Sequence, residues 1–97
     1  MTVEQAVKEI GQKGNCITTY THGIRKVRGD YKKNGQFFSF RVEEKGNATA
    51  LCININGMNF GKDFRGADRD EEIGTELVKA FRYIDGAAKF FRDYKKG

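Results

Sequence analysis

Apolar residues near the N-terminus recur with the period of a helix. Four of them occupy positions i, i+3, i+4 and i+7: Val3, Ala6, Val7 and Ile10. This spacing predicts a short helix over residues 2–13. Thr2 and Gln5 have the spacing of a capping box, in which each side chain satisfies a free backbone N–H of the other. Gly11 and Gly14 are expected to end the helix, because glycine tolerates a left-handed C-cap.

The C-terminal third repeats this period over a longer stretch. From Asp68 onward the spacing of three and four residues predicts one helix of about 25 residues. Its main apolar stripe is Ile73, Leu77, Phe81, Ile84, Ala88 and Phe91. Acidic residues cluster at its start and basic residues at its end, which complements the helix dipole. A second stripe makes the apolar face wider than packing on one sheet face requires: Tyr83, Ala87, Phe90 and Tyr94.

Between the helices, two turn signals predict hairpins whose registers agree. Asn34-Gly35 suits a two-residue type I′ turn, and Gly46-Asn47 offers a second two-residue turn. Each register, worked out independently, places the same residues on one apolar face: Phe38, Phe40 and Val42. Because a slip of one residue would move these side chains to the other face, the agreement supports a meander of at least three strands.

The segments flanking this meander are assigned by composition. Residues 16–22 are rich in Thr and predict an additional strand whose register stays open. Residues 57–66 contain three glycines and predict a loop that carries large apolar side chains: Met58, Phe60 and Phe64. The 97 residues allow one domain. We therefore expect residues 1–97 to form a single two-layer α+β domain. In it, an antiparallel meander of three or four strands packs against a long C-terminal helix and a short N-terminal helix.

Composition excludes several classes of protein. Eight Phe and four Tyr argue against disorder, and no apolar run approaches the roughly 18 residues of a membrane span. The first residues include Glu4, Lys8 and Glu9, which are unlike a signal peptide. Cys16 and Cys52, with one His, cannot supply the usual four zinc ligands. We expect reduced cysteines, a cytoplasmic protein, and neither a metal nor a cofactor.

Charge points to an anionic partner. Lys and Arg total 18 against 13 acidic residues, a net charge of +5, and the excess concentrates in residues 16–35. On an exposed sheet, an aromatic ring flanked by cations suits single-stranded nucleic acid. The candidate residues for nucleic acid or an acidic partner are Arg25, Lys26, Arg28, Lys32, Lys33, Phe37 and Arg41. The alternative is a solvated face with one exposed ring.

Aromatic residues outside the expected core suggest a second surface. Such residues are enriched at the buried centres of interfaces, and the candidates are Phe60, Phe64, Tyr83, Phe90 and Tyr94. Three outcomes stay open: a protein partner, a homodimer formed through the C-terminal helix, or coverage of the N-terminal helix by the same stripe.

No catalytic motif is present in the sequence. His22 has no Ser or Cys joined to it by a known pattern. The run from Gly57 to Lys62 misses the phosphate-loop pattern by one residue, and Asp63 replaces the Ser or Thr that binds magnesium. General acid–base catalysis needs titratable groups that converge in a pocket, so we expect a protein that is not an enzyme.

The order helix, three-stranded meander, long helix resembles the double-stranded-RNA-binding fold. Those domains open their last helix with a Lys-rich turn, whereas this chain has Asp68, Asp70, Glu71 and Glu72 there; their activity is therefore not carried over. The size and layout also resemble small phage-encoded anti-CRISPR proteins, which are motif-poor α+β binders. This resemblance implies an inhibitor or adaptor that occupies a surface of a protein or ribonucleoprotein complex. The alternative is a basic module that binds RNA or single-stranded DNA on its open sheet face.

Overall fold

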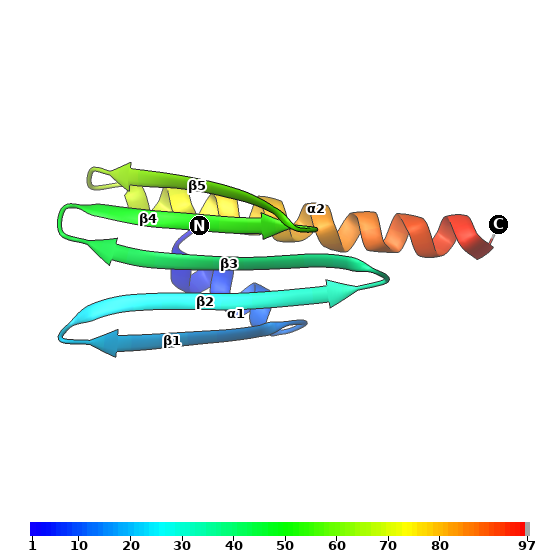
Figure 1. The fold of residues 1–97 in the computed structure, drawn as a ribbon, viewed down its shortest axis with the longest axis horizontal. Helices are drawn as coiled ribbons and strands as arrows, with labels where there is room; N and C mark the ends of the chain where they lie inside the picture. The colour runs from blue at the N-terminus through cyan, green and yellow to red at the C-terminus, as the bar shows by residue number, and fades with distance from the viewer. Residues whose placement is uncertain (97) are drawn as a thin grey trace.

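A computed structural model describes the backbone of residues 1–96 and the side chains of residues 1–86. Along the chain, one helix precedes a series of five strands and a second helix follows them (Figure 1). The elements are α1 (Val3–Gly11), β1 (Asn15–Thr21), β2 (Ile24–Lys33), β3 (Gln36–Lys45), β4 (Ala48–Ile55), β5 (Met58–Arg65) and α2 (Arg69–Lys96). The predicted α+β class and the order of helix, antiparallel meander and long helix are confirmed.

The sheet has five strands in the order β1-β2-β3-β4-β5, and each pairs antiparallel with its neighbour in sequence. The prediction of three or four strands was too low because residues 57–66, expected to be a loop, form β5. The cause is the turn at Asn56-Gly57, where φ is +52° and +90°. These are the left-handed values that a two-residue type I′ hairpin requires.

The predicted registers of β2, β3 and β4 are confirmed at every position. Gly29 pairs with Phe40, and Phe40 pairs in turn with Ile53. On the outer side, Cys16 pairs with Gly29, which fixes the register of β1 that the sequence left open. On the other edge, Phe60 pairs with Ile53. One cross-strand row therefore runs through all five strands.

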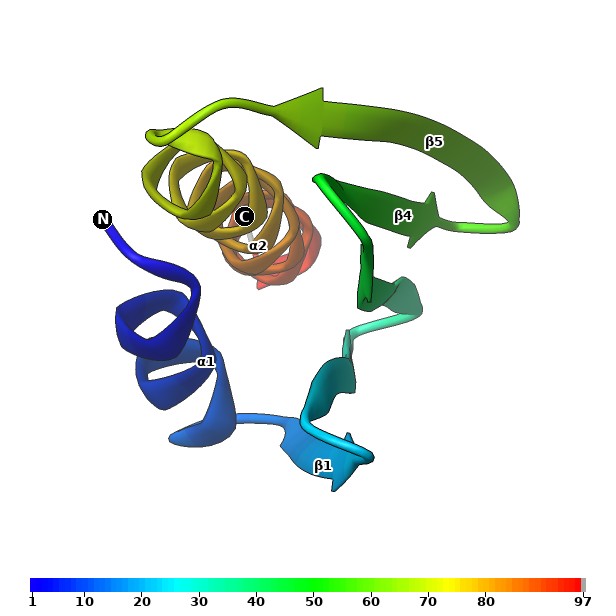
Figure 2. The same ribbon diagram turned by 90° about the vertical axis from the view of Figure 1, so that its left-hand side faces the viewer.

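Both helices lie on one side of the sheet, and the core is between them and that side (Figure 2). The sheet contributes the residues predicted for its apolar face: Phe38, Phe40, Val42 and Leu51 are buried, and Ile53 and Ile55 are partly buried. From α2, Phe81 stacks edge-on against Tyr31 with ring centroids 5.0 Å apart. The expected packing of the C-terminal helix across this face is confirmed.

The helix ends follow the sequence only in part. The capping box is present: Gln5 N donates to Thr2 Oγ1 at 3.1 Å, and Thr2 N donates to Gln5 Oε1 at 2.8 Å. The predicted glycine C-cap is wrong, because the capping residue is Gln12 in the right-handed region. Gly14 has a different role: a Cβ there would overlap the carbonyl oxygen of Asp30, so glycine lets the chain pass close to β2.

Helix α2 is one continuous helix through Gly86, as predicted. Near its start, a Cβ at Gly74 would overlap the backbone of Met1 and Thr2, so this glycine admits the N-terminal segment to the helix surface. Its last turns project past the end of the sheet (Figure 1), and the molecule is 51 Å long.

Candidate functional site

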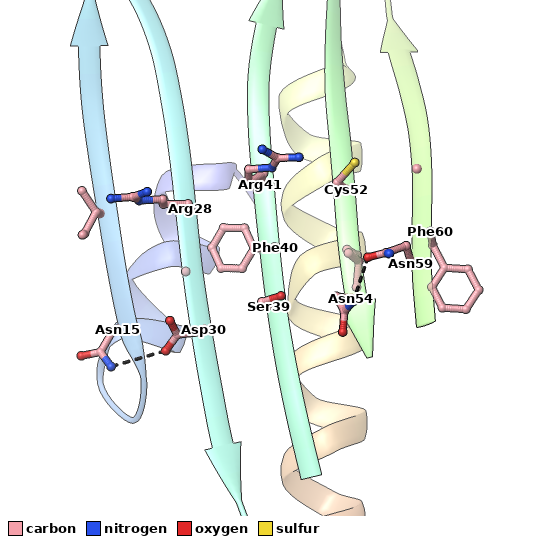
Figure 3. A pocket seen from close by; sticks show the side chains of 14 residues that line it. Asn15, Arg28, Asp30, Ser39, Phe40, Arg41, Cys52, Asn54, Asn59 and Phe60 are labelled. Atoms are coloured by element: carbon pink, nitrogen blue, oxygen red, sulfur yellow. Dashed lines mark hydrogen bonds between the residues drawn. The ribbon is translucent and has the colours of Figure 1, made fainter. Parts of the chain in front are cut away.

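The sheet face turned away from the helices is hollowed, and we call it the open face. Two neighbouring cross-strand rows form the hollow (Figure 3). The first row is Ile17, Arg28, Arg41, Cys52 and Gly61, and the second is Asn15, Asp30, Ser39, Asn54 and Asn59. The hollow has a volume of about 740 Å³, within the range of small-ligand sites.

Glycines shape this part of the sheet. Gly61 lies in the first row and has no side chain to fill the hollow, and the ring of Phe40 is visible beside β2 (Figure 3). Gly29 belongs to the helix-facing row. A Cβ at Gly29 would stand 2.6 Å from Cε1 of Phe40. Glycine is therefore required at this point of β2 for the Phe40 ring to occupy its place in the core.

Arg28 and Arg41 are the electrostatic centre of the open face. They are direct cross-strand partners, both are exposed, and the Arg28 side chain leans toward β1, away from Arg41 (Figure 3). Among the described residues, neither arginine has a carboxylate within ion-pair distance. Like charges directly opposite each other destabilise a sheet. An anion held between two guanidinium groups would remove that repulsion and accept forked hydrogen bonds.

Three more of the predicted binding residues share this face. Lys26 lies opposite Glu43, and Lys32 lies opposite Phe37, whose side chain is 38% exposed. Asp30 interrupts the basic series along β2 and accepts a 3.4 Å hydrogen bond from Asn15 Nδ2. Positive charge on the open face therefore spans β2 and β3 at Arg28 and Arg41, and along β2 it is interrupted only at Asp30.

Amide side chains fix the other end of the hollow. Asn54 donates from Nδ2 to Asn59 Oδ1 at 2.8 Å and accepts from Gly57 N at 3.0 Å. Asn56 in the same turn accepts from Phe37 N at 2.7 Å. Within the described side chains, the Nδ2 group of Asn59 keeps its donors unused. The sequence prediction assigned Asn59 to a loop and missed it; the available signal was the Asn56-Gly57 turn.

Two of the predicted basic residues lie on the opposite, helix-covered face. Arg25 Nη2 is 2.7 Å from Asp70 Oδ1, and its Nε is 3.4 Å from Glu44 without a hydrogen bond. Lys33 Nζ is 3.7 Å from Asp85 Oδ1. Both side chains join the sheet to helix α2 or to a neighbouring strand. They are therefore not part of the open face.

Asp70 and Asp85, the α2 carboxylates paired with these cations, have pKa values below the usual value for Asp. Burial raises the pKa of Asp70, but the hydrogen bonds from Arg25 and Val3 N and the charge of Arg25 together bring it below its usual value. The pKa of Asp85 is lowered by hydrogen bonds from Lys13 and Tyr31. Burial, with Asp85 as the hydrogen-bond acceptor, raises the pKa of Tyr31 to about 12. These groups hold the helices on the sheet.

The predicted aromatic surface divides into buried and exposed members. Phe64 belongs to the core at 7% exposure, whereas Phe60 and Tyr83 are 53% and 68% exposed and line one groove between β5 and α2. Tyr83 does not cover α1, because it is exposed and lies beside β5. The side chains of Phe90 and Tyr94 lie outside the described residues.

The remaining chemical candidates are dispersed. His22 is the first residue of the β1–β2 turn, exposed and with φ of +53°. Cys16 faces the helices, where burial raises the pKa of its thiol, and Cys52 is exposed on the open face. No three metal-ligating side chains cluster among residues 1–86. Over the same residues, neither helix contains a stretch long and apolar enough to cross a bilayer.

Comparison with protein-family models, with curated proteins and with solved structures finds no match for this chain. Its function is therefore inferred from its own surface.

Proposed function

We propose that this chain is a non-catalytic binding protein whose open face holds single-stranded nucleic acid by its phosphates. The observation that carries this proposal is the pair of exposed arginines, Arg28 and Arg41, directly opposite each other and without carboxylate partners in the described chain. A guanidinium pair of this kind is complementary to a phosphate, and the alternative, two unneutralised charges, lowers the stability of the sheet.

The surroundings of the arginine pair fit a strand of nucleic acid better than an isolated anion. Lys26 and Lys32 extend the positive potential along β2, and the exposed ring of Phe37 offers a surface on which a base can stack. Asn59 and Ser39 add hydrogen-bonding groups in the adjacent row. Each of these binding residues lies on a strand that is already paired in the sheet. Little backbone conformational entropy is therefore lost on binding.

The hollow does not bring together a general acid and a general base. Its titratable side chains besides the arginines are Asp30 and Cys52, which lie in different rows, and Asp30 is hydrogen-bonded to Asn15. Acid–base catalysis depends on such groups converging on one reacting atom. The proposed activity is therefore binding to a partner, without turnover of a substrate.

The test is binding of a fluorescent oligonucleotide of about twelve nucleotides, followed by anisotropy. The double variant Arg28→Gln/Arg41→Gln should bind at least about tenfold more weakly and show a shallower salt dependence, because two phosphate contacts are lost. The matched control, Lys8→Gln/Lys79→Gln, removes the same charge from exposed positions on the helices and should change affinity less than about threefold. Equal effects of the two variants would contradict the proposal.

Cys52 provides an independent readout. It is exposed and pairs with Arg41, whereas Cys16 faces the helices. Bound oligonucleotide should slow the labelling of Cys52 by a thiol reagent and leave the slower labelling of Cys16 unchanged. Unprotected Cys52 at saturating oligonucleotide would place the binding site elsewhere.

A second candidate is an inhibitor or adaptor that uses the same face against an acidic surface of a protein or ribonucleoprotein complex, as in anti-CRISPR proteins. The mixed row of Asp30, Ser39, Asn54 and Asn59 favours it, because such alternating donors and acceptors suit a polar protein interface. Capture of partners from host extract with and without nuclease separates the two. A partner that survives nuclease and depends on Arg28 and Arg41 supports the second candidate.

A further inference from the structure

The two edges of the sheet differ in charge. The edge strands are β1 and β5, and each is paired on one side only, with β2 or with β4 (Figure 1). β5 contains Lys62, Asp63 and Arg65, whereas β1 contains no charged residue. Charged side chains on an edge strand discourage another chain from pairing with it. The β5 edge is therefore protected in this way, and the β1 edge is not.

β1 has the composition of an interior strand. Of the five described strands, the other one without a charged residue is β4, which lies between β3 and β5. Three threonines, an isoleucine and a tyrosine give β1 a high β-propensity. Ile17 and Tyr20 are 49% and 70% exposed, on opposite faces of the sheet. Both the backbone edge and these two side chains are therefore available to a further strand.

The β1–β2 turn determines which backbone groups of β1 face outward. Its two residues, His22 and Gly23, have φ of +53° and +75°, as in a type I′ hairpin. The residues that flank such a turn form a hydrogen-bonded pair, and hydrogen-bonded pairs then alternate along the ladder. Outside β2, no backbone group of the described chain pairs with β1. The residues whose N–H and C=O groups point to the free edge are Cys16, Thr18 and Tyr20.

We propose that two copies of this chain pair antiparallel through their β1 strands, with the two-fold axis at Thr18. This register opposes Thr18 to Thr18 of the second copy, and Cys16 to Tyr20 in both directions. All three outward-facing residues of each strand then exchange hydrogen bonds, whereas a register centred on Ile17 or Thr19 would pair only two of them. The contact is isologous, so it closes as a dimer and leaves only the charged β5 edges free.

The absence of charge makes β1 complementary to itself. The chain has a net charge of +5, and like charges directly opposite each other destabilise a sheet. In the proposed register every opposing pair is neutral, and Thr18 forms a favourable Thr–Thr pair at the axis. Ile17 opposes Thr19 and is diagonal to Ile17 of the second copy, so the two exposed isoleucines approach each other. A second copy therefore fits this edge without any charged partner.

The dimer joins the open faces of its two copies into one surface. A two-fold axis perpendicular to the sheet keeps both open faces on the same side. Ile17 lies beside Arg28 in its row, and Thr19 lies beside Lys26, so Ile17 and Thr19 of the second copy separate Arg28 from Lys26 of that copy. These three strand-to-strand steps amount to about 14 Å. The pairing does not depend on the proposed binding of nucleic acid and is tested without it.

Sedimentation equilibrium without oligonucleotide tests the pairing. The unaltered chain should be a dimer at micromolar concentration. Thr18 is exposed and meets its own copy at the axis, so Thr18→Lys and Thr18→Glu should each weaken association at least about tenfold by opposing like charges. An equal mixture of the two variants should recover a heterodimer, because opposite charges then meet. The controls Met58→Lys and Met58→Glu place the same charges on the β5 edge, where Met58 is 63% exposed. They should change association less than about threefold, because that edge lies beyond a Debye length from the contact.

A disulfide probe tests the register. With Cys16→Ser and Cys52→Ser, the substitution Thr18→Cys should give a covalent dimer under mild oxidation, because the Cα atoms of opposing residues lie about 5.5 Å apart. Tyr20→Cys in the same background should not, since its two copies are about 14 Å apart along the strands. Three outcomes would overturn the proposal: a chain that is monomeric at every concentration, equal cross-linking at positions 18 and 20, or association only after addition of host protein, which would assign the β1 edge to a foreign strand.

Discussion

Basic side chains on the two faces of the sheet have different surroundings. On the helix-covered face, Arg25 and Lys33 lie near carboxylates of α2, at 2.7 and 3.7 Å. On the open face, Arg28 and Arg41 are direct cross-strand partners, and the described chain offers them no carboxylate within ion-pair distance. Because successive residues of a strand point to opposite faces, residues close in sequence are divided between holding the fold together and meeting a partner.

The aromatic residues divide in the same way. Phe37 and Phe38 are neighbours in β3, yet Phe38 is fully buried and Phe37 is 38% exposed. Composition alone would count both as core. The register of the strands, rather than residue type, therefore decides which side chains are available for recognition.

The largest expected contrast comes from these two rings. Phe38→Ala removes a side chain that packs against Phe40 and Phe81 and should lower the free energy of unfolding by about 3–5 kcal/mol. Phe37→Ala should change it by less than about 1 kcal/mol. Urea denaturation measures both. Comparable losses in the two variants would mean that the faces are not distinct.

Gly29 and Gly61 give the next contrast. In Gly29→Ala the new methyl would stand 2.6 Å from the Phe40 ring and 2.9 Å from Cys16 Sγ, and the resulting displacement should cost about 1–3 kcal/mol. In Gly61→Ala the methyl meets Cys52 Sγ at 3.6 Å, an ordinary contact. Thermal unfolding should show a clear decrease only for Gly29→Ala; an unchanged melting temperature would contradict the close approach described for Gly29.

Replacing one arginine on each face distinguishes a charge that stabilises the fold from a charge that we propose binds a partner. Arg25→Gln breaks the hydrogen bond to Asp70 and should cost about 1–2 kcal/mol. Arg28→Gln should leave stability unchanged or raise it by a few tenths of a kcal/mol, because it relieves repulsion from Arg41. The gain should be greatest at low salt, where screening is weakest. Denaturation at two ionic strengths checks both signs, and a loss in Arg28→Gln would disprove the repulsion.

The last contrast is a pH dependence of stability centred on Asp85. Its pKa is lower in the folded chain than in an unfolded one, so it stabilises the fold above about pH 4. This contribution is lost as the pH falls below that value toward the folded pKa. At pH 7, Asp85→Asn should cost about 1 kcal/mol, and the difference from the unaltered chain should shrink between pH 5 and pH 2. A constant difference over that range would exclude the linkage.

Much of the sheet could be predicted from the sequence because its turns are short. Asn34-Gly35 and Gly46-Asn47 fix where each hairpin reverses, and alternation then determines every pair. The same reasoning fails for β5, where Gly61 and the exposed Met58 and Phe60 make the strand look like a loop. An edge strand is half solvated, so its pattern is weaker than that of a central strand.

The sequence predicted the positions of the site residues wherever it predicted the register of the strands. The positions of Lys26, Arg28, Lys32, Phe37 and Arg41 on the open face follow directly from the hairpins. Arg25 and Lys33 were grouped with them by their place in the sequence, although alternation puts both on the other face. Their carboxylate partners belong to α2 and are 45 and 52 residues away, a separation that local patterns do not encode.

The contact of the N-terminal segment with Gly74 has a consequence for the order of folding. Val3 N donates to Asp70, and the residues between the two helices make up the entire sheet. During synthesis the hairpins can close one after another as each strand leaves the ribosome, because every strand pairs with its neighbour. Helix α1 is made before the sheet and contacts β1 and β2, yet its main packing partner, α2, emerges last. Much of the apolar side of the sheet stays uncovered for that interval, and a nascent chain paused before residue 69 should therefore be a preferred client of chaperones.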